Sequence, residues 1–224
     1  MRRPSHSIVT ALILCAALIG CAADGGDPQP AEGTAPAEQT PAEATPAEAT
    51  PAEASPGEDV TGATDPRNCD GTIGAESVEE VSVPTGAVCT LEGTRVQGNI
   101  AIGADATLRA DGITVDGNIQ SQGAAEVTVT GSAVEGNIQV EQGGSSTVRD
   151  TTIDGDLQWS DQSGPLIAER NTIDGNLQAE QNRGGLTVTD NRIDGNLECQ
   201  ANDPAPTGSG NVVSGSKEDQ CSGL

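Results

Sequence analysis

The sequence predicts an all-β protein, built as a single-stranded parallel β-helix (a solenoid) of about six to seven coils with 19–20 residues per coil. The first observation is a glycine that recurs every 19 and then every 20 residues, at Gly98, Gly117, Gly136, Gly155, Gly175, Gly195 and Gly215. A fixed period of this length is typical of a solenoid, in which one small unit stacks on copies of itself. The second observation is apolar alternation at period two, and the third is that no stretch shows helical periodicity.

Each glycine lies in a five-residue phrase, apolar-x-Gly-Asn-apolar, which reads VQGNI in its first copy and degenerates to VSGSK in its last. The apolar residues two before and two after the glycine predict a short strand on either side, each with one buried face. The glycine itself is expected at a bend, or where a side chain would crowd the next coil.

A second apolar pair precedes each glycine by nine and seven residues: Leu108/Ala110, Val127/Val129, Ser146/Val148, Leu166/Ala168 and Leu186/Val188. Cys89 and Leu91 occupy the same two positions, so we expect a further coil before the first clear repeat. Each coil therefore holds two or three strands. The extra residue of the longer coils is expected in the turn-like loops at 161–164 and 181–185. We take the coil to be right-handed, as most parallel crossovers are.

With this pattern, residues 69–221 resemble right-handed parallel β-helix proteins. More loosely, they are similar to the bactofilin-type, polymer-forming bacterial proteins, whose coils also carry a valine-x-glycine-aspartate/asparagine-apolar phrase. Bactofilins are typically cytoplasmic with a shorter coil, whereas this chain is expected to be exported and capped by disulfides. The resemblance implies the fold more than the function.

Residues 1–21 read as a bacterial lipoprotein signal peptide. Arg2 and Arg3 precede a short apolar run, and Leu-Ile-Gly-Cys resembles a lipobox, which makes Cys21 the expected lipidation site. The alternative is an ordinary cleaved signal peptide. Residues 22–66, rich in Pro, Ala, Glu and Thr, are expected to form a disordered, semi-stiff linker, because they hold too little apolar bulk to fold. Residues 67–224 are expected to form the β-helix domain. We therefore expect an exported protein, lipid-anchored to the bacterial cell membrane and facing its extracytoplasmic side.

The composition limits the partners. The formal net charge is −24, and removal of Arg2 and Arg3 with the signal peptide would lower it to −26. Nucleic acid and anionic lipid headgroups are poor partners for such a chain, because they are bound through Lys and Arg. The expected partners are the membrane, through the N-terminal lipid, and envelope proteins or glycans. The sequence does not determine the oligomeric state.

Four cysteines remain once Cys15 in the signal and Cys21 are set aside. Cys69 and Cys89 are one coil apart, and Cys199 and Cys221 are one coil plus two residues apart. Stacked neighbours in adjacent coils lie about 4.8 Å apart, within reach of a disulfide. We predict Cys69–Cys89 and Cys199–Cys221 in an oxidising compartment. A zinc site is the weaker alternative, because no CxxC pair and no histidine outside the signal supports it.

Stacking turns repeated residues into ladders. A structural amide ladder is expected from Asn99, Asn118, Asn137, Asp156, Asn176 and Asn196, and an outward stack from Gln120, Gln139, Gln158, Gln178 and Glu198. A third ladder is acidic: Asp116, Glu135, Asp154, Asp174 and Asp194, preceded by Gln97. Its functional interpretation is weak Ca²⁺ binding, since oxygen ligands are what the chain offers. The alternative is a solvated face that discourages aggregation. No other cofactor is expected.

Catalysis has few candidate agents, and we assign no catalytic residue. No histidine is left to activate a nucleophile. The pair Asp154/Asp174 has the spacing of a retaining glycosidase, but any acidic ladder would share it. The arginines available to a lyase are Arg149, Arg170 and Arg192. Trp159, the only aromatic residue, is either an exposed contact or a buried corner.

We therefore expect a nonenzymatic structural or interaction scaffold at the cell envelope. The alternatives are a Ca²⁺-dependent or glycan-binding module and, further off, a small polysaccharide lyase or hydrolase. Ice binding is a minor idea, since the TVT pairs at 128–130 and 187–189 are separated by coils that break the threonine array.

Overall fold

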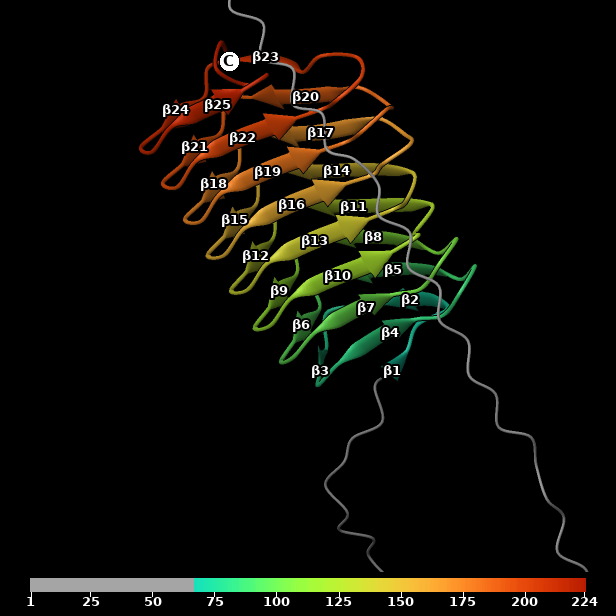
Figure 1. Ribbon diagram of the computed structural model, residues 1–224. Coiled ribbons are helices and arrows are strands. Elements are labelled where there is room, and N and C mark those ends of the chain that lie inside the picture. The colour runs from blue at the N-terminus through green and yellow to red at the C-terminus, as the bar shows by residue number, and fades with distance from the viewer. Residues whose placement is uncertain (1–66) are drawn as a thin grey trace, which may run out of the picture. The chain divides into compact units, whose positions relative to one another are not determined.

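The computed structural model describes residues 67–224 and confirms the parallel β-helix. Three sheets of parallel strands run along the coil, with one strand of each sheet per turn (Figure 1). Sheet A contains β1 (Arg67–Asn68), β4 (Val81–Val83), β7 (Ile100–Ile102), β10 (Ile119–Gln122), β13 (Ile138–Glu141), β16 (Leu157–Ser160), β19 (Leu177–Glu180), β22 (Leu197–Gln200) and β25 (Lys217–Asp219).

Sheet B contains β2 (Gly71–Ile73), β5 (Val88–Glu92), β8 (Thr107–Asp111), β11 (Glu126–Thr130), β14 (Ser145–Arg149), β17 (Leu166–Glu169), β20 (Leu186–Thr189) and β23 (Thr207–Ser209). Sheet C contains two-residue strands only: β3 (Ser77–Val78), β6 (Arg95–Val96), β9 (Thr114–Val115), β12 (Ala133–Val134), β15 (Thr152–Ile153), β18 (Thr172–Ile173), β21 (Arg192–Ile193) and β24 (Val212–Val213).

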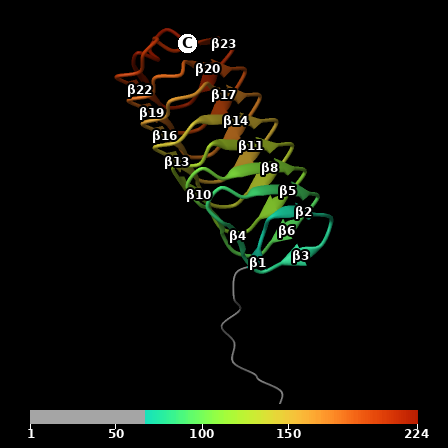
Figure 2. The same ribbon diagram turned by 90° about the vertical axis from the view of Figure 1, so that its right-hand side faces the viewer.

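The coil is right-handed, as expected. In Figure 1 the chain runs to the right along sheet A, returns to the left along sheet B behind it, and rises by one turn. Figure 2, turned by 90°, shows sheets A and B on the two sides of the solenoid. The coil has about eight turns, more than the six to seven predicted. The prediction missed turns at the N-terminal end because β1 to β4 pair in register without carrying the glycine phrase.

The core consists of the residues that the alternation places inward. The apolar residues flanking each glycine face inward from sheets C and A, and the second apolar pair faces inward from sheet B. In the middle turns these side chains are almost completely buried. The longer coils carry their extra residue between sheets A and B, as predicted: β13 and β14 are joined by residues 142–144, and β16 and β17 by residues 161–165.

The repeated glycine is required by a close approach and not by an unusual backbone angle. A Cβ atom on Gly117 would lie 2.6 Å from the Asn99 Oδ1 and 2.7 Å from the Gly98 carbonyl oxygen of the previous turn. Gly117 also lies at a bend, between sheets C and A, so both roles expected for this glycine are confirmed, and the turn that a side chain would crowd is the previous one. The left-handed corners lie elsewhere, for example at Asp150, Arg170 and Asp190, which stack at the end of sheet B.

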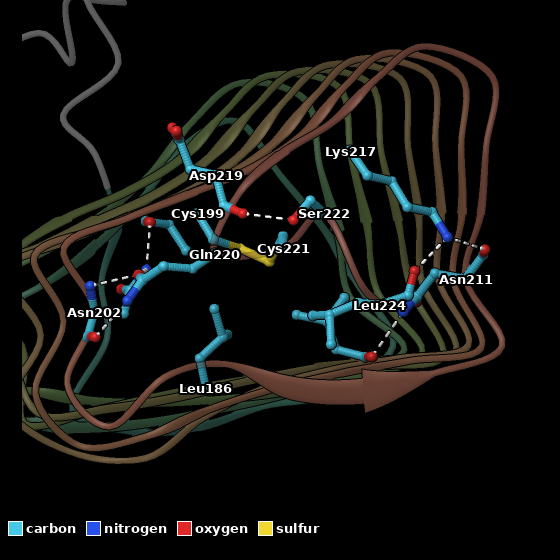
Figure 3. The surroundings of a disulfide bond; sticks show 12 residues. Leu186, Cys199, Asn202, Asn211, Lys217, Asp219, Gln220, Cys221, Ser222 and Leu224 are labelled. Carbon is cyan, nitrogen blue, oxygen red and sulfur yellow. Dashed lines mark hydrogen bonds between the residues drawn. A yellow bond between two sulfur atoms is a disulfide. The ribbon is translucent and has the colours of Figure 1, made fainter. Parts of the chain in front are cut away.

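Both predicted disulfides are present, with Cα–Cα distances of 5.4 Å for Cys69–Cys89 and 5.3 Å for Cys199–Cys221. Figure 3 shows the second bond at the C-terminal end of the coil. There Gln220 accepts a bond from the Asn202 amide and donates one to its carbonyl, and Lys217 donates to the carbonyls of Asn211 and Leu224 (Figure 3). Side-chain hydrogen bonds and the disulfide therefore connect the last turn of the coil to the turn before it. The two disulfides indicate an oxidising, extracytoplasmic environment.

We expect the double substitution Cys199→Ala/Cys221→Ala to lower the free energy of unfolding by about 3 kcal/mol, because a loop of this length loses that much conformational freedom when it is closed. Urea denaturation monitored by far-ultraviolet circular dichroism measures the loss. Reduction of the unsubstituted protein should lower its stability, whereas the reductant should affect the double variant only through Cys69–Cys89. Equal stability of the two oxidised proteins would contradict a stabilising role for this bond.

The signal peptide, Cys21 and the linker 22–66 lie outside the described residues. Within residues 67–224, no helix is long and apolar enough to span a bilayer.

Candidate functional site on the outer face of sheet A

The outward positions of sheet A form two straight columns along the coil, which we call the sheet A face. Strand register places one residue of the first column on each turn from β4 to β25, and one residue of the second column on each turn from β10 to β22. The first column is Ser82, Ala101, Gln120, Gln139, Gln158, Gln178, Glu198 and Glu218, and the second is Gln122, Glu141, Ser160, Glu180 and Gln200. The predicted glutamine stack is therefore real and belongs to a wider amide and carboxylate surface.

Two hollows lie on the sheet A face and adjoin each other. The larger, about 500 Å³, extends over β4, β7, β10 and β13, and the smaller, about 190 Å³, over β13, β16 and β19. Gln139 and Glu141 line both. Together they make one shallow groove along the coil axis, from Ser82 to Glu180.

Side-chain size explains where the groove is deepest. The first column holds Ser82 and Ala101 where later turns hold glutamine. Because these side chains are short, the groove is deeper here, between Pro84 on one side and the glutamines of β10 on the other. No signal in the repeat phrase points to this hollow, since the phrase ends one residue before the column begins.

The side chains of the groove are only partly paired with one another. Gln139 Nε2 donates to Glu141 Oε1 at 2.7 Å, and Gln178 Nε2 donates to Glu198 Oε2 at 3.2 Å. Within the part of the chain that the structure describes, the side chains of Gln120 and Gln122 make no hydrogen bond. Donors and acceptors in the deeper half are thus available to a ligand.

Ion pairs are segregated away from this face. Seven ion pairs occur among residues 67–224, and six of them lie on sheets B and C or at their corners. The seventh joins Arg67, in the terminal strand β1 of sheet A, to Glu76, away from the two columns. No lysine or arginine occupies an outward position of sheet A in the described residues. Glu141, Glu180 and Glu198 consequently have no basic partner there.

The predicted asparagine ladder is structural. Each Oδ1 accepts a bond from the backbone N–H of the next turn: Asn118 donates to Asn99 at 2.9 Å and Asn137 to Asn118 at 2.8 Å. Asp156 fits the same position because an acceptor oxygen is all that the ladder needs, and it accepts from the Asn176 N–H at 2.7 Å. The ladder borders the sheet A face and holds the turns at a constant spacing.

Sequence reasoning missed two further ladders, both buried. Asn171, Asn191 and Asn211 stack at the corner between sheets B and C, and Asn182 and Asn202 stack at the corner between sheets A and B. Each Oδ1 accepts the N–H of the previous turn, and each Nδ2 of the first group donates to a carbonyl 23 residues earlier. The signal was present, since these asparagines recur at the period of 20 residues.

The acidic ladder follows sheet C, one residue per turn. Asp116 pairs with Arg95 at 2.7 Å and Asp194 with Arg192 at 3.2 Å, whereas Glu135, Asp154 and Asp174 are exposed. Among residues 67–224, no group of three or more acidic, histidine or cysteine side chains is close enough together to hold a metal ion. The structure therefore does not gather the ladder into a compact metal site.

Calcium binding by the acidic ladder stays a prediction, and the effect of Ca²⁺ on the melting temperature tests it. If the ladder binds Ca²⁺, millimolar Ca²⁺ raises the melting temperature of the protein, and Asp174→Asn reduces the rise because it removes a central oxygen ligand. Mg²⁺ at the same concentration controls for screening of the net negative charge. A melting temperature that does not change with Ca²⁺ would rule the hypothesis out.

The three arginines considered for lyase chemistry are engaged in ion pairs. Arg149 lies 3.1 Å from Glu169, Arg170 pairs with Asp150 at 2.7 Å and also with Glu169, and Arg192 pairs with Asp194. The hydrogen bond from Arg170 lowers the pKa of Asp150 below its usual 3.8, and the same bond raises the pKa of Arg170. Asp154 and Asp174 lie on adjacent turns of the exposed ladder, with no arginine paired to either in the described residues.

Trp159 is buried, with 1% of its surface exposed, and is therefore not a contact residue on the outside. It points inward from β16, and its Nε1 donates to the Oγ of Ser146 on β14 at 3.0 Å. The face of sheet A consequently has no aromatic side chain on which a sugar ring could stack.

No protein-family model, curated protein or solved structure matches this chain. The likeness to bactofilins therefore remains limited to the shared phrase.

Proposed function

We propose that this protein is an exported, lipid-anchored envelope lipoprotein whose solenoid acts as a nonenzymatic interaction scaffold, with the sheet A face as its binding surface. The groove on this face supports the proposal most directly, because it is continuous over several turns, carries amide and carboxylate side chains, and is free of internal ion pairs. A surface that repeats at each turn suits an elongated partner, as the extended faces of other solenoids do.

The regularity of the coil also supports a scaffold over an enzyme. An active site needs a few convergent groups in a shaped cavity. Here the hollows are shallow, and their lining mixes glutamines and glutamates with serines and apolar residues such as Pro84 and Ala101. The acids and arginines outside them are exposed or paired with one another. The disulfides fit the proposed location, since they require an oxidising compartment.

A glycan-binding module is the second candidate, because amide side chains hydrogen-bond readily to hydroxyl groups. The lack of an exposed aromatic residue weakens it. The chain contains no Phe or Tyr, and its one Trp is buried.

Two measurements test the proposed function. In a bacterial host, the intact chain should fractionate with membranes, and Cys21→Ser should release it, because that substitution removes the expected lipid site. The purified protein should leave a panel of envelope polysaccharides uncleaved, with and without Ca²⁺. Turnover of any of them would overturn the nonenzymatic proposal, and membrane association that survives Cys21→Ser would overturn the lipid anchor.

A further inference from the structure

The charge pattern of the sheet A face points to the chemical class of its partner. Five arginines, Arg95, Arg109, Arg149, Arg170 and Arg192, lie on sheets B and C or at their corners and pair there with nearby acids. The protein leaves Glu141 and Glu180 in the groove without such partners, although the chain as a whole is strongly negative. Unpaired carboxylates repel one another, and a ligand that carries positive charge would relieve this repulsion.

We propose that the groove of the sheet A face binds an extended, cationic polypeptide segment that lies along the coil axis. The groove runs from β4 to β19. At about 4.8 Å per turn this is a length of roughly 24 Å, which an extended segment of about seven residues would span. The partner is thus a short basic stretch in extended conformation and not a helix, whose diameter of about 10 Å the shallow floor would not enclose.

The groups in the groove suit such a segment. Glu141 and Glu180, two turns apart, accept charged hydrogen bonds from lysine or arginine side chains. The carboxamides of Gln120 and Gln122 both donate and accept, so they can pair with the peptide backbone. Ala101 and Ser82 leave room for the segment at the deep end of the groove. The surrounding negative charge would speed its association.

The alternatives fit less well. A nucleic acid would be repelled by every charge on this face. A neutral oligosaccharide would gain nothing from the unpaired carboxylates, and it would find no aromatic platform. The inference rests on the proposed function only in taking the sheet A face as the binding surface.

The test is fluorescence anisotropy of a labelled twelve-residue peptide of alternating lysine and serine, titrated with the mature chain at low salt. The sheet A variant Glu141→Gln/Glu180→Gln should weaken binding about fivefold. A matched control, Glu92→Gln/Asp111→Asn, removes the same number of charges from exposed positions on sheet B and should weaken it less than about twofold. Ala101→Gln, which extends the glutamine column into the hollow without changing charge, should weaken it about threefold.

Equal losses of peptide affinity in the sheet A and sheet B variants would overturn the proposal, because they would show that the net charge of the protein alone attracts the peptide. Absence of peptide binding would overturn it as well. So would binding of an uncharged oligosaccharide, cellohexaose, that Ala101→Gln abolishes while the lysine peptide remains unbound. Unchanged fluorescence of the buried Trp159 shows that each variant is folded. Failure of this test with membrane association intact and no glycan turnover would leave the scaffold proposal standing without this partner.

Discussion

Replacement of Trp159 by alanine is expected to lower the free energy of unfolding by about 4 kcal/mol, because it removes the largest fully buried side chain of the core. The cavity would open in the middle of the stack, between turns that the strand ladders hold at a fixed spacing. These turns have little freedom to collapse around it. Urea denaturation measures the loss.

Ser146 provides the matched control. It occupies the inward position of sheet B that holds a leucine or valine in the neighbouring turns, and its small size makes room for the indole. Ser146→Ala should cost only about 1 kcal/mol, the value of the lost hydrogen bond.

The double variant Trp159→Ala/Ser146→Leu should recover at least half of the loss. It recreates the pairing found one turn on, where Ala179 stands thirteen residues after Leu166. A double variant no more stable than Trp159→Ala would contradict size compensation across the core.

Asn191→Leu is expected to lower the free energy of unfolding by about 4 kcal/mol although leucine has a similar volume. The Oδ1 of Asn191 accepts the backbone N–H of Asn171 at 3.0 Å, and its Nδ2 donates to the Ala168 carbonyl at 2.9 Å. All these groups are buried, so leucine would leave a donor and an acceptor unpaired, each at a cost of about 1–3 kcal/mol. Thermal and urea denaturation both report the change.

The control is the same substitution in the bordering ladder, Asn176→Leu. Asn176 is only partly buried. Its Oδ1 accepts a hydrogen bond from the backbone N–H of Asn196, which is also partly exposed and can therefore bond to water instead. The loss there should be about 1 kcal/mol. Equal losses at the two positions would show that burial of the ladder does not determine its contribution.

The period and the alternation of the sequence were enough to predict the fold, the inward and outward positions and both disulfides. This worked because in a solenoid each turn contacts its neighbours in register, so distance along the chain converts directly into distance in space. Cys69 and Cys89 could be paired on that ground alone. The asparagine ladder was predictable for the same reason. The buried asparagine ladders are equally periodic. Their burial was not predicted, because polar residues in a loop are usually exposed to solvent.

What the repeat could not decide was anything that depends on a comparison between turns or between faces. The register places Trp159 at an inward position, but the room for its indole depends on Ser146, thirteen residues earlier and on a different sheet. The groove exists because two turns carry serine and alanine where others carry glutamine. The separation of ion pairs from the groove on sheet A depends on which face each arginine occupies. The sequence by itself determined the coil, because local register is set by nearest-neighbour stacking. The tertiary structure decided the binding face, because shape and charge there are sums over several turns.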